Sequence, residues 1–162
     1  MPFRSMAVAA AFVILSATPV LAQPPARLDA RAAQAIIAGC VVHSTSRGQS
    51  HAIAVTDAGG QVVAALRMDG NSYGVMDFAL AKARASSAWG GATAGLAEGA
   101  RTVPGFADAP HVVTVPGGVP VFSADGRERI GAVGVSGEAP ADDVACAEAG
   151  VTAAGLRSRR AG

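Results

Sequence analysis

Two basic side chains stand where a folded chain usually avoids charge. Arg67 ends an apolar segment, and Lys82 lies in the middle of an alanine-rich one. Charges in such positions either pair with an opposite charge or bind a ligand. An arginine fork, a lysine ammonium and the turn at Gly137, which precedes the backbone N–H groups of a helix start, could together hold a carboxylate. The alternative is an internal ion pair of Lys82 with Asp69 or Asp143.

The same residues could serve an enzyme. Lys82 or Asp143 would then be the general acid or base, and Arg67 would clamp a substrate carboxylate. The sequence shows no persuasive Ser-His-Asp, Cys-His or paired-carboxylate spacing, so it does not predict hydrolysis by such a centre.

The three histidines, His43, His51 and His111, do not have the spacing of a zinc site. His111 follows a loop that contains proline and glycine and precedes a glycine-rich segment. It is therefore the best placed of the three to bind a ligand. A solvated histidine at the end of a loop is the alternative.

The two cysteines, Cys40 and Cys146, fall on the first and last predicted helices. In an oxidising compartment two half-buried cysteines can form a disulfide, which needs Cα atoms roughly 4.4–6.8 Å apart. The alternative is two unrelated small core residues. Neither cysteine has a basic neighbour in sequence that would make it a nucleophile.

Hydrophobic periodicity and turn residues predict an α+β fold. Asp29 is the expected N-cap of the first helix, and Gly90 the expected end of the middle one. The predicted helices cover residues 28–43, 73–89 and about 140–156, with one further helical turn at 93–98. The predicted strands cover residues 51–56, 61–68, 112–115, 119–123 and 130–136. In the order α-β-β-α-β-β-β-α, these elements form one domain with an antiparallel five-stranded sheet flanked by helices.

The last predicted strand is unusual because it contains or adjoins Gly131, Gly134 and Gly137. Glycine weakens a strand, so three of them indicate that another backbone, a partner chain or a ligand approaches closely there.

Several of these segments together resemble one family. GGVPV (residues 117–121), GAVGVSG (131–137) and the following Asp143, Ala147 and Gly150 look like the closing signature of the GlcG/HbpS family. This haem-binding-protein-like domain also occurs at the C-terminus of PduO-type proteins. AVTDAGGQVVAALRMDG (54–70) resembles its first hairpin and ALAKARA (79–85) its middle helix. The resemblance covers roughly residues 28–156.

The resemblance implies haem or a related tetrapyrrole as the ligand, in haem sequestration or redox sensing. The family pattern assigns no axial ligand to a residue of this chain; by its position His111 is the candidate, and Arg67, Lys82 and Gly137 could line the propionate site. A competing hypothesis is an enzyme or accessory subunit acting on a small carboxylate metabolite, and a third is an oligomer without a ligand. The core, rich in Ala, Val and Gly, favours a homo-oligomer in each case.

Two positions depart from the family pattern. Glu138 replaces the second glycine of the common SGG and, with Asp142 and Asp143, makes the turn acidic, which suits a hard cation or iron. Arg84 replaces the usual small residue after Lys82 and Ala83, which adds bulk and charge to the middle helix.

The N-terminus predicts export. Arg4, the apolar run of residues 6–15 and the Val20-Leu21-Ala22 end are typical of a signal peptide spanning residues 1–22. The apolar run is too short for the about 20 residues of a membrane anchor. Cleavage near Ala22 would leave a periplasmic or secreted domain of residues 23–156 and a polar, fraying tail of residues 157–162. The cleaved chain, residues 23–162, would have 12 basic residues (13 − 1 after loss of Arg4) against 12 acidic ones, and this balance gives no electrostatic footprint for nucleic acid.

Overall fold

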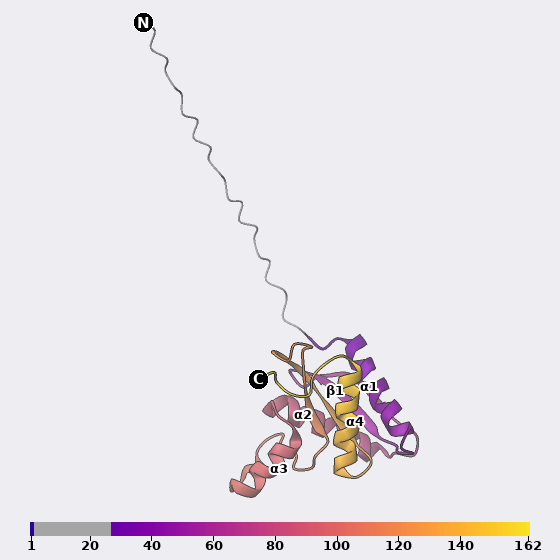
Figure 1. Cartoon of the computed structure of the whole chain (residues 1–162). Coiled ribbons are helices and arrows are strands. Elements are labelled where there is room, and N and C mark those ends of the chain that lie inside the picture. The colour runs from indigo at the N-terminus through magenta and orange to yellow at the C-terminus, as the bar shows by residue number, and fades with distance from the viewer. Residues whose placement is uncertain (2–26) are drawn as a thin grey trace.

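The computed structural model describes Met1 and residues 27–162, so the predicted signal peptide beyond Met1 lies outside the described residues. An antiparallel sheet is covered by helices on both faces (Figure 1). The helices are α1 (Ala30–Thr45), α2 (Tyr73–Trp89), α3 (Thr93–Thr102), the short 3₁₀ helix η1 (Phe106–Asp108) and α4 (Pro140–Ala153). The strands are β1 (Ala52–Asp57), β2 (Val62–Arg67), β3 (Gly118–Phe122) and β4 (Arg129–Ser136), in the spatial order β2-β1-β4-β3.

Helices α1 and α4 pack side by side on one face of the sheet (Figure 1). The Asp29 carboxylate caps α1 by accepting a hydrogen bond from the Ala32 N–H, as the sequence predicts. A Cβ atom on Gly150 of α4 would overlap the carbonyl oxygen of Ile36 in α1. The two helices can therefore approach closely only because glycine stands at their crossing point.

The larger part of the core lies between these helices and the sheet. β-Branched residues of the central strands, such as Ile53, Val55, Val133 and Val135, are fully buried there. They alternate along each strand with smaller residues that face the other way, which is the pattern of a strand covered on both faces.

Helix α2 covers the opposite face of the sheet through very small side chains. Ala52 and Ala54 of β1 pack against Ala79 and Ala83 of α2. A Cβ atom on Gly134 of β4 would overlap the Ala79 carbonyl oxygen and the Ala83 nitrogen. The sequence left open whether another backbone, a partner chain or a ligand approaches the glycine-rich strand. At Gly134 it is the backbone of α2.

The predicted α+β class is confirmed, but the prediction of five strands was wrong. The structure has four strands within its described residues, and the order is α-β-β-α-α-β-β-α. Residues 112–115 form no strand but an irregular segment. It directly follows a turn in which Val112 donates its N–H to the Ala109 carbonyl and His111 has a positive φ of 61°. The single helical turn expected after Gly91 is a ten-residue helix, α3.

The C-terminal tail, which was expected to fray, crosses the β3–β4 hairpin. Arg157 and Phe122 exchange two backbone hydrogen bonds, of 2.7 and 3.2 Å, and Ala161 donates to the Gly126 carbonyl. No helix in the described part of the chain is both long and apolar enough to span a membrane.

Candidate functional site

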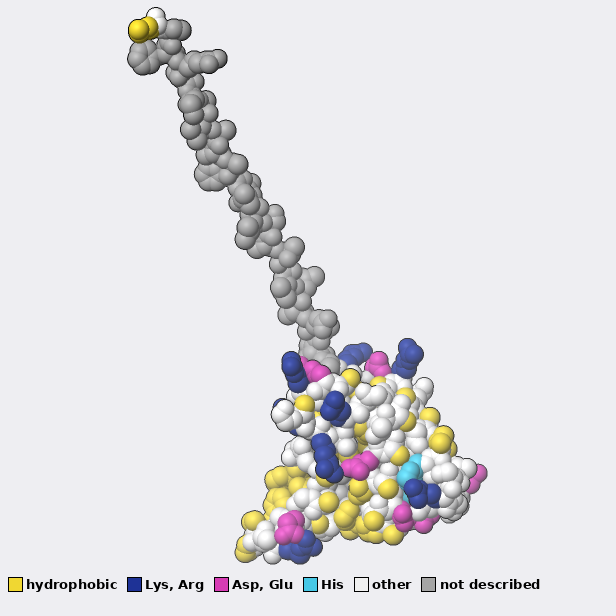
Figure 2. Space-filling view, viewed as in Figure 1, with side chains coloured by type: hydrophobic (Ala, Val, Ile, Leu, Met, Phe, Trp, Pro, Cys, Tyr) yellow, Lys and Arg dark blue, Asp and Glu magenta, His cyan; other side chains and the backbone are white. Residues whose placement is uncertain are grey.

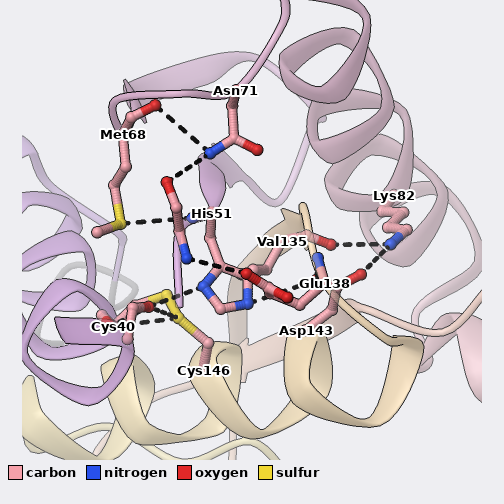
Figure 3. A network of polar contacts seen from close by, with 11 residues as sticks. Cys40, His51, Met68, Asn71, Lys82, Val135, Glu138, Asp143 and Cys146 are labelled. Atoms are coloured by element: carbon pink, nitrogen blue, oxygen red, sulfur yellow. Dashed lines mark hydrogen bonds and ion pairs between the residues drawn. A yellow bond between two sulfur atoms is a disulfide. The ribbon is translucent and has the colours of Figure 1, made fainter. Parts of the chain in front are cut away.

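A chain of buried polar side chains joins helices α1, α2 and α4 across strand β1 (Figure 3). We call Ser44, His51, Asp143 and Lys82 the buried polar chain. Each is at most 2% exposed. Such residues are seldom buried in proteins unless they satisfy one another.

Lys82 and Asp143 form the charged end of this chain. The Lys82 Nζ atom lies 2.8 Å from Asp143 Oδ2 and donates a second hydrogen bond of 2.9 Å to the Val135 carbonyl. Lys82 reaches from α2 to the first turn of α4 (Figure 3). Of the two interpretations of Lys82, the structure thus contains the internal ion pair, and the partner is Asp143 rather than Asp69.

His51 occupies the middle of the chain. Its Nδ1 atom lies 2.8 Å from Ser44 Oγ, and its Nε2 atom lies 3.6 Å from Asp143 Oδ1, beyond hydrogen-bond distance. Burial lowers the pKa of His51, because the imidazolium would lose its hydration, while the carboxylates of Asp143, Glu138 and Asp142 act against this shift. The described fold therefore favours a neutral His51.

The other end of the chain reaches a disulfide. Cys40 of α1 and Cys146 of α4 are bonded, with Cα atoms 4.7 Å apart, and the described residues contain no free cysteine. Ser44 lies one helical turn after Cys40; its hydroxyl donates to the Cys40 carbonyl and lies 3.1 Å from Cys146 Sγ. The disulfide and the polar chain thus fix the same two helices.

The acidic turn after β4 is used internally. The Glu138 N–H donates to Asp143 Oδ1 over 3.2 Å, and the Glu138 carboxylate accepts the Ser50 N–H over 3.1 Å. A Cβ atom on Gly137 would come within about 3 Å of His51 Cα, and Gly137 has a φ of 144°. No group of three or more His, Cys, Asp or Glu residues in the described part of the chain, including Glu138, Asp142 and Asp143, has a geometry that could hold a metal ion.

His111 lies on the surface in the loop between η1 and β3, beside two adjoining depressions of about 300 and 330 Å³. Both depressions are bordered by His111 and by Arg84 of α2. The first extends to the β1–β2 turn at residues 58–61, and the second runs along α2 past Leu80 to Val113. We call the two together the His111 depression.

The predicted ligand-binding residues therefore separate into two groups. Arg67 and Gly137 flank the end of the sheet where Ala52 pairs with Arg67 and with Ser136, and Arg67 donates there to the Asn71 carbonyl. The His111 depression borders the opposite end of the β1–β2 hairpin, about 15 Å away along the strands. Lys82 is buried, and its ammonium is bound to Asp143 and to the Val135 carbonyl. The structure does not bring His111, Arg67, Lys82 and Gly137 into one pocket.

Sequence reasoning missed two features of these sites. Arg84 was noted only as a departure from a pattern, yet it lies next to His111 in both depressions. The link from Ser44 to His51 was not predicted either. The spacing of Cys40 and Ser44, which places both on one face of a helix, was the available signal.

Comparison with known proteins relates most of the described chain to one family. Its family model, described as haem degrading protein HbpS-like, matches residues 28–152. A double mutant of HbpS from Streptomyces reticuli is 26% identical and superposes with a TM-score of 0.72, over 88% of this chain and 97% of that one. A search of curated proteins finds no match.

Two further solved structures share the fold at lower identity. The protein ORFY of Klebsiella pneumoniae is 22% identical with a TM-score of 0.74, over 85% of this chain and 97% of that one. A PduOC–haem complex is also 22% identical, with a TM-score of 0.73 over 83% of this chain and all of that one. The glycine-rich closing motifs predicted membership of this family, and the family match over residues 28–152 confirms it. This chain belongs to the HbpS-like family.

Proposed function

We propose that this protein binds haem or a related tetrapyrrole at the His111 depression, and that it acts after export in haem sequestration or redox sensing. Membership of a family described as haem degrading supports the ligand class. The proposed location of the ligand rests on one observation: His111 and Arg84 border both adjoining depressions.

The residues of this surface fit the chemistry of the ligand. Haem requires an axial ligand, which the exposed imidazole of His111 can supply. Its propionates require a cationic partner, and the Arg84 guanidinium offers a planar fork. Leu80, Ala81 and Val113 line the second depression and provide apolar surface for the macrocycle. Bound haem would supply redox chemistry at its iron, while these side chains bind and orient it.

Arg84 takes the role that the sequence suggested for Lys82. Lys82 already neutralises Asp143 and is 1% exposed, so using it for a propionate would leave a buried carboxylate unpaired. Arg67 and Gly137 remain candidates for a ligand at the other end of the sheet. The alternative of an enzyme acting on a small carboxylate requires Lys82 or Asp143 to reach a substrate, and their mutual burial favours the binding protein instead.

A haemin titration of the chain from residue 23, followed by absorbance, tests this proposal. We expect a saturable Soret shift, its loss in His111→Ala, and roughly tenfold weaker binding in Arg84→Gln, since a charge-assisted contact is removed. His43→Ala is the matched control and should titrate like the unmodified protein. The absence of a saturable shift would reject haem as the ligand, and an unchanged shift in His111→Ala would reject His111 as the axial residue.

Export and self-association belong to the same proposal. The buried disulfide supports an oxidising compartment, because disulfides persist there and are rare in the cytosol. Edge strand β2 supports a homo-oligomer, since its outer edge has no partner strand in the described chain and Val62 and Leu66 are 46% and 38% exposed. N-terminal sequencing of exported protein should begin near Gln23, and light scattering should give a mass above that of one chain. A concentration-independent monomer would contradict the oligomer.

A further inference from the structure

A third depression, of about 370 Å³, lies beside edge strand β3. It is bounded by β3, helix α4, the start of α3 and the C-terminal tail. Val119, Pro120 and Phe122 of β3 and Val144 of α4 form its apolar floor. Glu148, Arg159 and Arg160 form its charged rim. We call this depression the tail pocket. Its volume is in the range of small-molecule sites.

The tail that supplies the two arginines is held in place at several points. Besides the backbone pairing of Arg157 with Phe122, the Arg157 side chain donates to the Ala124 carbonyl over 2.9 Å. The Arg160 side chain donates to the Arg127 carbonyl over 3.1 Å. The rim of the tail pocket is therefore built by hydrogen bonds to the β3–β4 hairpin and not by a loose chain end.

The charges of the rim are only lightly used by the protein itself. Arg159 lies 3.8 Å from Glu148, and both side chains are largely open to solvent, at 86% and 41% exposed. Ion pairs of this kind contribute little to stability. The Arg160 guanidinium lies 5.6 Å from the centre of the Phe122 ring, which leaves most of its N–H groups for other partners.

The surrounding surface has the same two-part character. The Arg157 side chain binds the hairpin at the Ala124 carbonyl, while Arg127 meets the tail through its backbone carbonyl and its own side chain lies 3.8 Å from Asp125. Figure 2 shows basic side chains near the C-terminal end of the chain and a band of hydrophobic side chains below them, towards α3. An apolar floor beside Arg159 and Arg160 favours a ligand that is itself apolar at one end and anionic at the other.

We propose that the tail pocket binds a small amphipathic carboxylate, an aromatic or aliphatic group that carries one carboxyl group. The apolar group would cover Val119, Pro120 and Val144, and the carboxylate would take the place of Glu148 at Arg159, with Arg160 beside it. None of the residues that line the tail pocket is a His, Cys, Met or Tyr, so the site offers no axial ligand for a haem iron. It is thus a site for a metal-free anion, separate from the His111 depression.

Calorimetric titration of the chain from residue 23 with naphthoate tests this site. We expect saturable binding at about one naphthoate per chain and at least roughly tenfold weaker binding of the neutral naphthamide, because the amide lacks the negative charge and the second acceptor oxygen that an arginine fork binds. Arg159→Gln and Arg160→Gln should each weaken naphthoate binding by about tenfold. Arg47 is an exposed arginine in the turn after α1, so Arg47→Gln is the matched control and should leave naphthoate binding unchanged.

A second variant tests the pocket without removing charge. Ala94 is exposed at the start of α3 and lines the pocket, so Ala94→Phe should fill its mouth and abolish naphthoate binding while the protein stays folded. Equal binding of naphthoate and naphthamide, or unchanged naphthoate binding in the two Arg→Gln variants and in Ala94→Phe, would overturn the proposal. The haemin titration separates the two sites: Arg159→Gln should keep the Soret shift, and His111→Ala should keep naphthoate binding.

Discussion

At the scale of single residues, Lys82 is a charged side chain buried in the interior, and its contacts determine its role. The Lys82 ammonium binds Asp143 Oδ2 and the Val135 carbonyl, and Asp143 Oδ1 accepts the Glu138 N–H, so each polar atom of the pair has a partner. A buried pair of this kind adds little net stability compared with apolar residues, but the loss of one partner is costly. The pair therefore fixes how α2 and α4 lie on the sheet.

Lys82→Met is expected to lower the free energy of unfolding by about 3 kcal/mol, because it leaves the Asp143 charge buried and unpaired. Urea unfolding monitored by circular dichroism measures this change. In the double variant with Asp143→Asn, part of the loss should be recovered, since the unpaired charge is gone. A single variant as stable as the original protein would show that Asp143 finds another partner or becomes protonated.

His51 predicts a pH dependence of stability. Because burial lowers its pKa in the folded state, the unfolded chain binds more protons once the pH falls below the ordinary histidine value of about 6.5. The contribution of His51 to stability is therefore complete above that value and is lost as the pH falls towards the pKa of the folded state. Urea unfolding at about pH 7.5 and about pH 5.5 should show this decrease, and His51→Gln should reduce it. An equal decrease in the variant would assign it to other groups.

At the scale of elements, α2 rests on the sheet through small residues on both sides. Gly134 of β4 faces the backbone of α2 at Ala79 and Ala83, and Gly118 of β3 faces the Lys82 carbonyl. This close packing also sets the position of Lys82, because the helix must lie near the sheet for Nζ to reach both Val135 and Asp143.

Gly134→Ala should destabilise the protein by about 3 kcal/mol, since the added Cβ would overlap the α2 backbone, which cannot move as a flexible side chain can. Gly95→Ala is the matched control. Nothing lies within 4 Å of a Cβ at Gly95, which is in α3, and alanine there should be neutral or stabilise by up to about 1 kcal/mol. Thermal unfolding of the two variants gives the comparison, and similar stabilities would contradict the close approach of α2.

At the scale of the whole molecule, the Cys40–Cys146 disulfide joins the first and last helices through two cysteines that are 106 residues apart in sequence. α1 is the first helix of the described fold and α4 the last, and the bridge lies between them, next to the buried polar chain (Figure 3). Closing so long a loop removes much of the conformational freedom of the unfolded chain.

Replacing both cysteines, as Cys40→Ala with Cys146→Ala, is expected to lower stability by about 4 kcal/mol. The melting temperature of the unmodified protein should fall similarly after incubation with dithiothreitol under unfolding conditions. The double variant should not respond to the reductant. A reductant effect of the same size in the double variant would show that the disulfide is not its cause.

The sequence by itself determined the family, the α+β class, the cap at Asp29, the end of α2 at Gly90 and the close approach at the glycine-rich strand. These features depend on local rules: side-chain periodicity, capping chemistry and the need of a backbone for glycine. The sequence also placed Lys82 and Asp143 among candidate partners, because buried opposite charges pair.

Only the tertiary structure decided what these residues do together. In the folded chain Cys40 is bonded to Cys146, His51 lies between Ser44 and Asp143, and His111 lies far from Arg67. In place of the strand expected at residues 112–115 the fold has an irregular segment, and the tail lies across the β3–β4 hairpin. The reason is that contacts between distant segments depend on sheet order and helix packing, which periodicity along one segment does not record.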